Sequence, residues 1–201
     1  MMELYSSGDC LDCHRIRFLL AEKGINVRII DVDEKPDAAA DMAELNPYGT
    51  TPTLVDRDIV LYGTWVVADY VDERYPHPPL MPIDPISRAR LRLAMYRVQR
   101  DWFTAAEHIL GLEGRELERA RRSLRESLTA ADELFAVSTY LLSDELSLLD
   151  CLLVPFFWRL PVYGINLSRN AVNIQKYIDR VFARESFQRS LTPAERAMRE
   201  V

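Results

Sequence analysis

From Met2 to about Glu73 the chain alternates short apolar runs with segments of helical periodicity. Four runs have the length of strands, at residues 2–5, 27–30, 53–55 and 59–61. Apolar stripes at helical spacing predict three helices, from Cys13 to Gly24, over residues 38–45 and from Thr64 to about Glu73. A helix joins the first two strands, so they should be parallel, whereas the last two should form an antiparallel hairpin.

A proline-rich stretch then interrupts the pattern. The segment Tyr75-Pro76-His77-Pro78-Pro79-Leu80-Met81-Pro82 cannot form a regular helix or a central strand, because proline has no backbone N–H to donate. Beyond Ser87 the pattern is almost entirely helical. Helices are predicted at residues 87–108, 115–135, from 147 on and at 171–183, with a short last one from 193. We therefore expect a first domain over residues 1–76, a linker over 77–86 and an all-helical domain over 87–201.

The elements of the first part follow the order strand, helix, strand, helix, strand, strand, helix. This order resembles the thioredoxin-like arrangement of glutathione transferases. The fold class that we expect is α/β plus all-α, that is, a glutathione-transferase fold. It would have an N-terminal thioredoxin-like domain and a C-terminal helical bundle.

Composition and charge narrow the range of partners. The net charge of −6 disfavours direct, sequence-specific binding to nucleic acid and favours a partner with basic patches.

The longest apolar stretch, residues 146–158, is interrupted by Asp150 and Pro155 and is too short to cross a bilayer. The sequence does not begin like a signal peptide, and its three cysteines fit a reducing compartment. We expect a cytoplasmic protein that does not bind membranes.

The first candidate for chemistry is the turn Cys10-Leu11-Asp12-Cys13, which follows the first strand and opens the first helix. The free N–H groups and the positive dipole end of a helix N-terminus stabilise a thiolate. The segment resembles the active-site segment of glutaredoxins in position and length, although Leu11 stands where that family has proline.

Other features of this turn oppose thiol chemistry. Asp9 and Asp12 place negative charge beside the thiols, which disfavours a thiolate. In the alternative interpretation, Cys13 is a small core residue and Cys10 an incidental loop thiol. A metal site of Cys10, Cys13 and His14 would show only three ligands, so no metal is expected.

Two further positions match the ligand cleft of glutathione transferases. Thr51-Pro52 precedes the third strand, where thioredoxin-like folds have a cis-proline that turns the backbone of Thr51 toward a ligand. Because the whole superfamily keeps this turn, the position is evidence for the fold rather than for a ligand-binding function. Thr64 begins a helix and could hold a ligand carboxylate. However, Gly63 stands where those enzymes have an acidic or amide residue that holds the ligand's ammonium group. The cleft is therefore expected to be vestigial, and no cofactor is expected.

Nearly the whole chain also resembles the stringent starvation protein A family. The most specific match is residues 70–88, around Pro76-His77-Pro78. Further matches lie at residues 21–24, 46–47, 52–56, 140–145, 157–161 and 190–196. Prolines around exposed aromatic and apolar groups suit a contact surface on physical grounds too, because pre-ordered groups lose little entropy on binding.

This resemblance implies a bacterial transcription regulator that forms homodimers, binds RNA polymerase holoenzyme and has no glutathione-transferase activity. It implies that Pro76, His77 and Pro78 contact the polymerase, and we add Tyr75, Pro79 and Leu80 by adjacency. The helices from Thr64 and Ser87 are the expected dimer surfaces. Gly63 and the Cys10/Cys13 pair depart from the family pattern.

Two other classes of function stay open at this point. One is a glutathione-dependent thiol transferase or redox-responsive protein, with Cys10 as nucleophile and Cys13 as resolving thiol. The other is an unrelated scaffold that merely dimerises on this fold.

Overall fold

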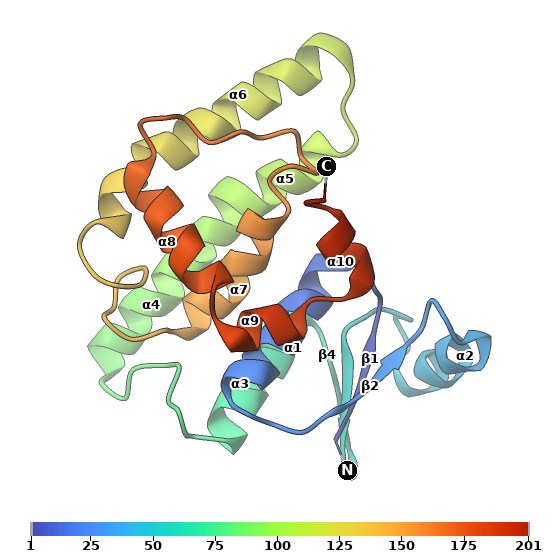
Figure 1. Cartoon of the computed structure of the whole chain (residues 1–201). Coiled ribbons are helices and arrows are strands. Elements are labelled where there is room, and N and C mark those ends of the chain that lie inside the picture. The colour runs from blue at the N-terminus through green and yellow to red at the C-terminus, as the bar shows by residue number, and fades with distance from the viewer. Residues whose placement is uncertain (1, 201) are drawn as a thin grey trace. The chain divides into compact units, whose positions relative to one another are not determined.

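The computed structural model describes residues 2–200 of the chain (Figure 1). Its contacts divide these residues into two compact units. Unit 1 contains the residues up to Leu80 together with those from Arg184 on, and unit 2 spans Met81–Ala183. No helix within residues 2–200 is long and apolar enough to span a membrane.

Unit 1 is built on a sheet with the strand order β2-β1-β3-β4. Its strands are β1 (Glu3–Ser6), β2 (Arg28–Asp31), β3 (Thr53–Asp56) and β4 (Ile59–Tyr62). β1 and β2 are parallel, with Leu4 opposite Ile29, and β3 is antiparallel to both β1 and β4. The predicted strands and their directions are confirmed.

Helices cover both faces of this sheet (Figure 1). The helices are α1 (Leu11–Glu22), α2 (Pro36–Leu45) and α3 (Thr64–Arg74). α1 packs against α3 on one face, and α2 lies on the other. Neighbouring side chains of β1 point to opposite faces, so Tyr5 packs with Ala38 and Met42 of α2.

The C-terminal helices belong to unit 1. They are α9 (Glu185–Ser190), which packs along α1, and α10 (Pro193–Ala197). Glu195 of α10 is fully buried and pairs with Arg17 of α1 at 2.6 Å. We predicted a helical domain that extends to residue 201, whereas the described residues after Arg184 pack in the first unit. The buried ion pair of Arg17 and Glu195 joins residues that are distant in the chain, and local periodicity does not reveal such a contact. The division into residues 1–76, 77–86 and 87–201 stays a prediction.

Unit 2 is helical. Its segments are α4 (Pro85–Val98), η1 (Gln99–Phe103), α5 (Thr104–Ile109), α6 (Gly114–Ala130), η2 (Asp132–Phe135), α7 (Leu148–Trp158) and α8 (Val172–Phe182). Every residue of α7 is buried. Around it, the ring of Trp102 stacks on Phe135 and Phe156, with ring centroids 6.5 Å apart in both pairs. α7 is therefore the central helix of this core.

The start of α7 is a capping box formed by Ser147 and Asp150. The buried carboxylate of Asp150 accepts hydrogen bonds from the backbone N–H and the hydroxyl of Ser147, both at 2.8 Å. The same carboxylate accepts from the Tyr177 hydroxyl at 2.7 Å and from the Leu141 N–H at 3.2 Å. It thus ties the helix start to α8 and to the preceding loop.

Ser147→Ala is expected to lower the free energy of unfolding by about 1 kcal/mol, because the helix loses its capping side chain and Asp150 loses one donor. Urea unfolding followed by circular dichroism measures this loss. Ser123→Ala on the exposed surface of α6 is the matched control and should change stability little. An equal loss in both variants would contradict the capping role.

Candidate functional site

The predicted thiol turn lies in unit 1 between β1 and α1. Cys10 is the N-cap of α1, and its Sγ accepts a hydrogen bond from the Cys13 N–H at 3.3 Å. Cys13 is fully buried, and its Sγ accepts from the Ser7 N–H at 3.4 Å. Both cysteines are free thiols. The two residues thus form a contacting pair in which Cys10 is the accessible member.

The two thiols differ strongly in acidity. A hydrogen bond from the Cys13 side chain, with further bonds from the Cys13 N–H and the Thr51 hydroxyl, lowers the pKa of Cys10 to about 6. Its hydrogen bond to Cys10, with burial, raises the pKa of Cys13. Asp12 opposes the Cys10 thiolate, as the sequence indicated, but Arg15 pairs with this carboxylate at 2.6 Å. The hydrogen bonds therefore outweigh the nearby negative charge.

The predicted cis peptide is present at Thr51-Pro52. The Thr51 hydroxyl lies within hydrogen-bond reach of both thiols and can donate its one proton to either, so Cys10, Cys13 and Thr51 form one cluster. Thr64 is buried at the start of α3, and no described contact joins it to this cluster. Gly63 precedes it with a φ of 83°, a conformation that favours glycine, which is a backbone reason for the missing side chain. Within residues 2–200, no group of three or more His, Cys, Asp or Glu side chains is placed to hold a metal.

The second predicted site is the loop after α3, also in unit 1. We call residues 75–79 the proline loop. Pro76, His77, Pro78 and Pro79 are exposed, and Tyr75 is half-buried. The His77-Pro78 peptide is cis. Leu80, which the sequence analysis added to this surface by adjacency, is only 3% exposed, so its side chain is removed from the proposed surface.

Lys23, directly after α1, holds the backbone of the proline loop through hydrogen bonds from its buried ammonium group. Its ammonium nitrogen lies 2.7 Å from the carbonyl oxygens of both Tyr75 and Pro78, and 2.8 Å from the carboxylate of Asp72. Asp72 also accepts the Leu80 N–H at 3.1 Å. This contact could not be predicted from the sequence, because Lys23 is 49 to 55 residues from its partners and has no local pattern that marks it as buried.

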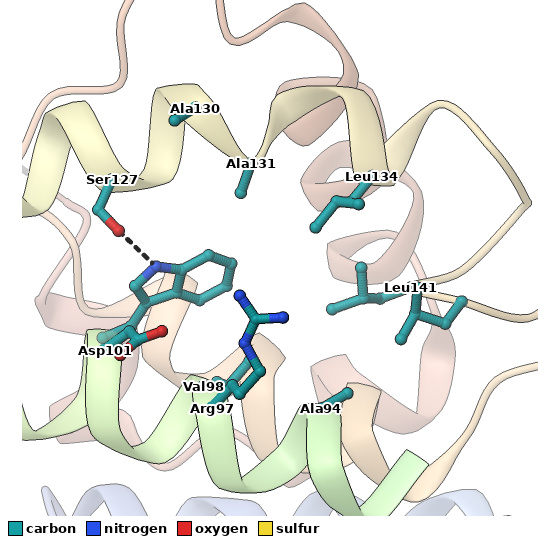
Figure 2. Close-up of a pocket in the computed structure, with 11 residues that line it drawn as sticks. Ala94, Arg97, Val98, Asp101, Ser127, Ala130, Ala131, Leu134 and Leu141 are labelled. Atoms are coloured by element: carbon teal, nitrogen blue, oxygen red, sulfur yellow. Dashed lines mark hydrogen bonds between the residues drawn. The ribbon is translucent and has the colours of Figure 1, made fainter. Parts of the chain in front are cut away.

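Unit 2 contains a separate hollow of about 380 Å³ that the sequence did not indicate (Figure 2). It lies between α4 and η1 on one side and α6 and η2 on the other. One dashed bond in Figure 2 runs from the indole N–H of Trp102 to the Ser127 hydroxyl at 3.1 Å. The lining is mainly apolar, with Arg97 and Asp101 as its charged members.

Models of known families match both parts of the chain. The N-terminal domain of glutathione S-transferase matches residues 9–74, and its C-terminal domain matches residues 90–185. A stringent starvation protein A homolog of Coxiella burnetii is 42% identical over 202 residues, which cover 100% of this chain and 96% of the relative. A homolog of the same name from Pasteurella multocida is 41% identical over 194 residues, with 95% and 90% covered. Glutathione S-transferase omega-2 of Mus musculus is 30% identical over 171 residues, with 82% and 68% covered.

Solved structures agree on the fold. The Tau class glutathione S-transferase from mango has a TM-score of 0.84 at 19% identity and covers 98% of this chain and 95% of its own. The theta class enzyme from Xanthomonas axonopodis pv. citri, with glutathione bound, has a TM-score of 0.78 at 20% identity, with 94% and 96% covered. The expected fold class is thus confirmed. With this fold, and with full-length relatives at about 40% identity, the chain belongs to the stringent starvation protein A family.

Proposed function

We propose that the protein is a bacterial transcription regulator that binds RNA polymerase holoenzyme through Pro76, His77, Pro78 and their neighbours Tyr75 and Pro79. The names of its full-length relatives support a regulator of the stringent starvation protein A type. The observation that carries the surface assignment is the exposure of these side chains on a loop whose backbone is held by buried Lys23. We place this activity in the cytoplasm.

The hold on the loop backbone matters for binding. A surface that is already ordered loses little conformational entropy when a partner docks. The Lys23 ammonium fixes one carbonyl on each side of His77, and the side chain of Lys23 is fully buried. The imidazole and the proline rings are therefore presented on a fixed backbone. The net charge of −6 suits a docking partner that carries basic patches.

The same proposal includes the absence of glutathione-transferase activity. Gly63 provides no side chain for the ammonium group of glutathione, and Thr64 is buried. No cofactor is assigned to the regulator.

The test is a capture experiment. The tagged chain is immobilised and incubated with purified holoenzyme at moderate salt, and the polymerase subunits retained are quantified. Stoichiometric retention is expected, while retention no greater than on an unloaded matrix would overturn the proposal. A conjugation assay with glutathione and an electrophilic aromatic substrate, run on the same preparation, should show no turnover above the uncatalysed rate.

We also propose that the chain forms a homodimer. Exposed apolar side chains support this on both expected helices: Trp65 and Val66 on α3, and Leu93 and Tyr96 on α4. Exposed clusters of this kind often mark interaction surfaces. Light scattering should give twice the chain mass of 23.2 kDa, and Leu93→Glu with Tyr96→Glu should shift the mass to that of the monomer. A wild-type mass of one chain would contradict the dimer.

A further inference from the structure

The regulator proposed above does not use the pair Cys10 and Cys13. The third cysteine, Cys151, is buried in unit 2 and is not part of the pair. A core-packing role explains Cys13, which is fully buried, but it does not explain Cys10, which is partly exposed. A helix N-cap role explains the position of Cys10 but not its sulfur, because serine is a better cap.

The surroundings of the Cys10 sulfur are those of a thiolate. It accepts hydrogen bonds from the Cys13 thiol, from the Cys13 N–H and from the Thr51 hydroxyl. Charged acceptors form stronger hydrogen bonds than neutral ones, so three donors favour the ionised sulfur. The start of a twelve-residue helix adds its dipole in the same direction.

We propose that Cys10 and Cys13 form a thiol–disulfide exchange site that reduces small disulfides, with a preference for cationic over anionic ones. In the first step the Cys10 thiolate attacks one sulfur of the disulfide RS–SR. A bond forms between Cys10 Sγ and that sulfur, the RS–SR bond breaks, and RS⁻ leaves. In the second step the released RS⁻ accepts the proton of Cys13, Cys13 Sγ attacks Cys10 Sγ, and the mixed disulfide breaks to release a second RS⁻, which solvent protonates. The chain is oxidised by two electrons to an internal disulfide, and one RS–SR is reduced to two RSH.

The second step is favoured by the first. In the resting pair, the hydrogen bond to Cys10 and the Cys10 charge are two of the three causes that raise the pKa of Cys13. A mixed disulfide at Cys10 has no negative charge, so both causes are removed. The Ser7 N–H remains a donor to Cys13 Sγ, and the Thr51 hydroxyl can then turn its one proton from Cys10 to Cys13. The buried thiol is therefore activated only after Cys10 has reacted.

The preference for cationic disulfides follows from the carboxylates around this turn. Asp9 is exposed next to Cys10, and Asp33 accepts the N–H of Gly8 at 2.9 Å. The Asp31 and Asp33 carboxylates lie within 4 Å of the position that a Cβ on Gly8 would occupy. The basic side chains of α1 near the turn are engaged with acids, Arg15 with Asp12 and Arg17 with Glu195. A negatively charged disulfide is thus repelled by this rim, and a positively charged one is attracted.

The first test follows the reactivity of Cys10. The full chain is alkylated with iodoacetamide across pH 4–10, and the modified peptide is identified by mass spectrometry. The alkylation rate of Cys10 should reach half its maximum near pH 6, whereas an ordinary thiol does so at about 8.5. Cys13→Ala should move this midpoint upward, because it removes the thiol donor. A wild-type midpoint in the ordinary range would overturn the proposal.

The second test follows the products. Wild-type chain treated with cystamine should end as an internal Cys10–Cys13 disulfide with no bound cysteamine. Cys13→Ala should retain one cysteamine on Cys10, and Cys10→Ser should retain none while keeping the helix cap. A stable adduct on the wild-type chain would rule out Cys13 as the resolving thiol. Circular dichroism of each variant checks that it is folded.

The third test concerns charge. Rates with cystamine and with oxidised glutathione are each divided by the rate of free cysteine with the same compound. The normalised rate should be severalfold higher for cystamine, and the difference should shrink with added NaCl and in Asp9→Asn. Equal normalised rates at low salt would overturn the charge preference.

Cys10→Ser leaves the proline loop unchanged, so this variant should still capture the polymerase. Polymerase capture by this variant therefore separates a failure of the thiol–disulfide exchange site from a failure of the proposed regulator.

Discussion

Replacement of Pro76, His77 and Pro78 together by alanine should abolish the capture of RNA polymerase holoenzyme. These side chains are exposed, so their loss removes contact groups without opening the core. Central contact residues of an interface commonly contribute about 2 kcal/mol or more each, so three such losses should weaken binding by at least about a hundredfold. Biolayer interferometry with immobilised chain measures the dissociation constant.

A second loop of unit 1 provides the matched control. Pro47 and Tyr48 are also exposed, and Tyr48 is 74% exposed, so Pro47→Ala with Tyr48→Ala removes similar groups elsewhere. This control should bind holoenzyme like the wild-type chain. Undiminished binding by a triple variant with an unchanged melting temperature would refute the surface assignment. A large loss of binding in the control variant would place the polymerase contact on the loop of Pro47 and Tyr48 and so contradict the proposed surface.

The single His77→Ala variant separates chemistry from backbone shape. His77 lies between the two carbonyls that Lys23 holds, so this change removes the imidazole while both prolines and both backbone contacts stay. If the imidazole is a central contact, binding should weaken by about tenfold or more. Binding at the wild-type level would assign recognition to the proline rings alone.

Much of unit 1 could be predicted because its strands are visible in the sequence as short apolar runs of neighbouring residues. The apolar run near Leu4 and the hairpin around Arg57 depend on residues that are neighbours in the chain. The proline loop could be located for the same reason. What the sequence did not reveal are contacts between distant charged residues that are buried, such as Arg17 with Glu195. Local periodicity reports which face is apolar, and it reports nothing about a charge that is buried because a partner compensates it.

The thiol turn shows the same limit in its electrostatics. The sequence showed Asp12 beside the cysteines and so suggested an unfavourable site for a thiolate. The structure places Arg15 on that carboxylate and directs the Thr51 hydroxyl to the sulfur. Leu80 is the opposite case, because adjacency to the prolines suggested an exposed side chain that is in fact buried. In both cases the deciding information is three-dimensional.

Lys23→Met should have the largest effect on stability among the changes considered, because it removes a buried ammonium with three partners. Asp72, which is nearly buried, would be left without its cation. Removing one member of a buried ion pair costs about 3–5 kcal/mol, which corresponds to a melting temperature lower by about 10 °C in a chain of this size. Differential scanning calorimetry measures this change. Lys35→Met, at an exposed lysine of the same unit, should leave the melting temperature nearly unchanged.

The double variant Lys23→Met with Asp72→Asn separates stability from loop order. It removes the uncompensated carboxylate, while the amide oxygen of asparagine can still accept the Leu80 N–H. Much of the lost stability should therefore return. The carbonyls of Tyr75 and Pro78 still lack their charged donor, so the proline loop should stay more mobile and polymerase binding should stay weak. Hydrogen exchange at His77 reports the mobility directly. Recovery of stability together with full binding would show that recognition does not depend on the hold that Lys23 has on the loop.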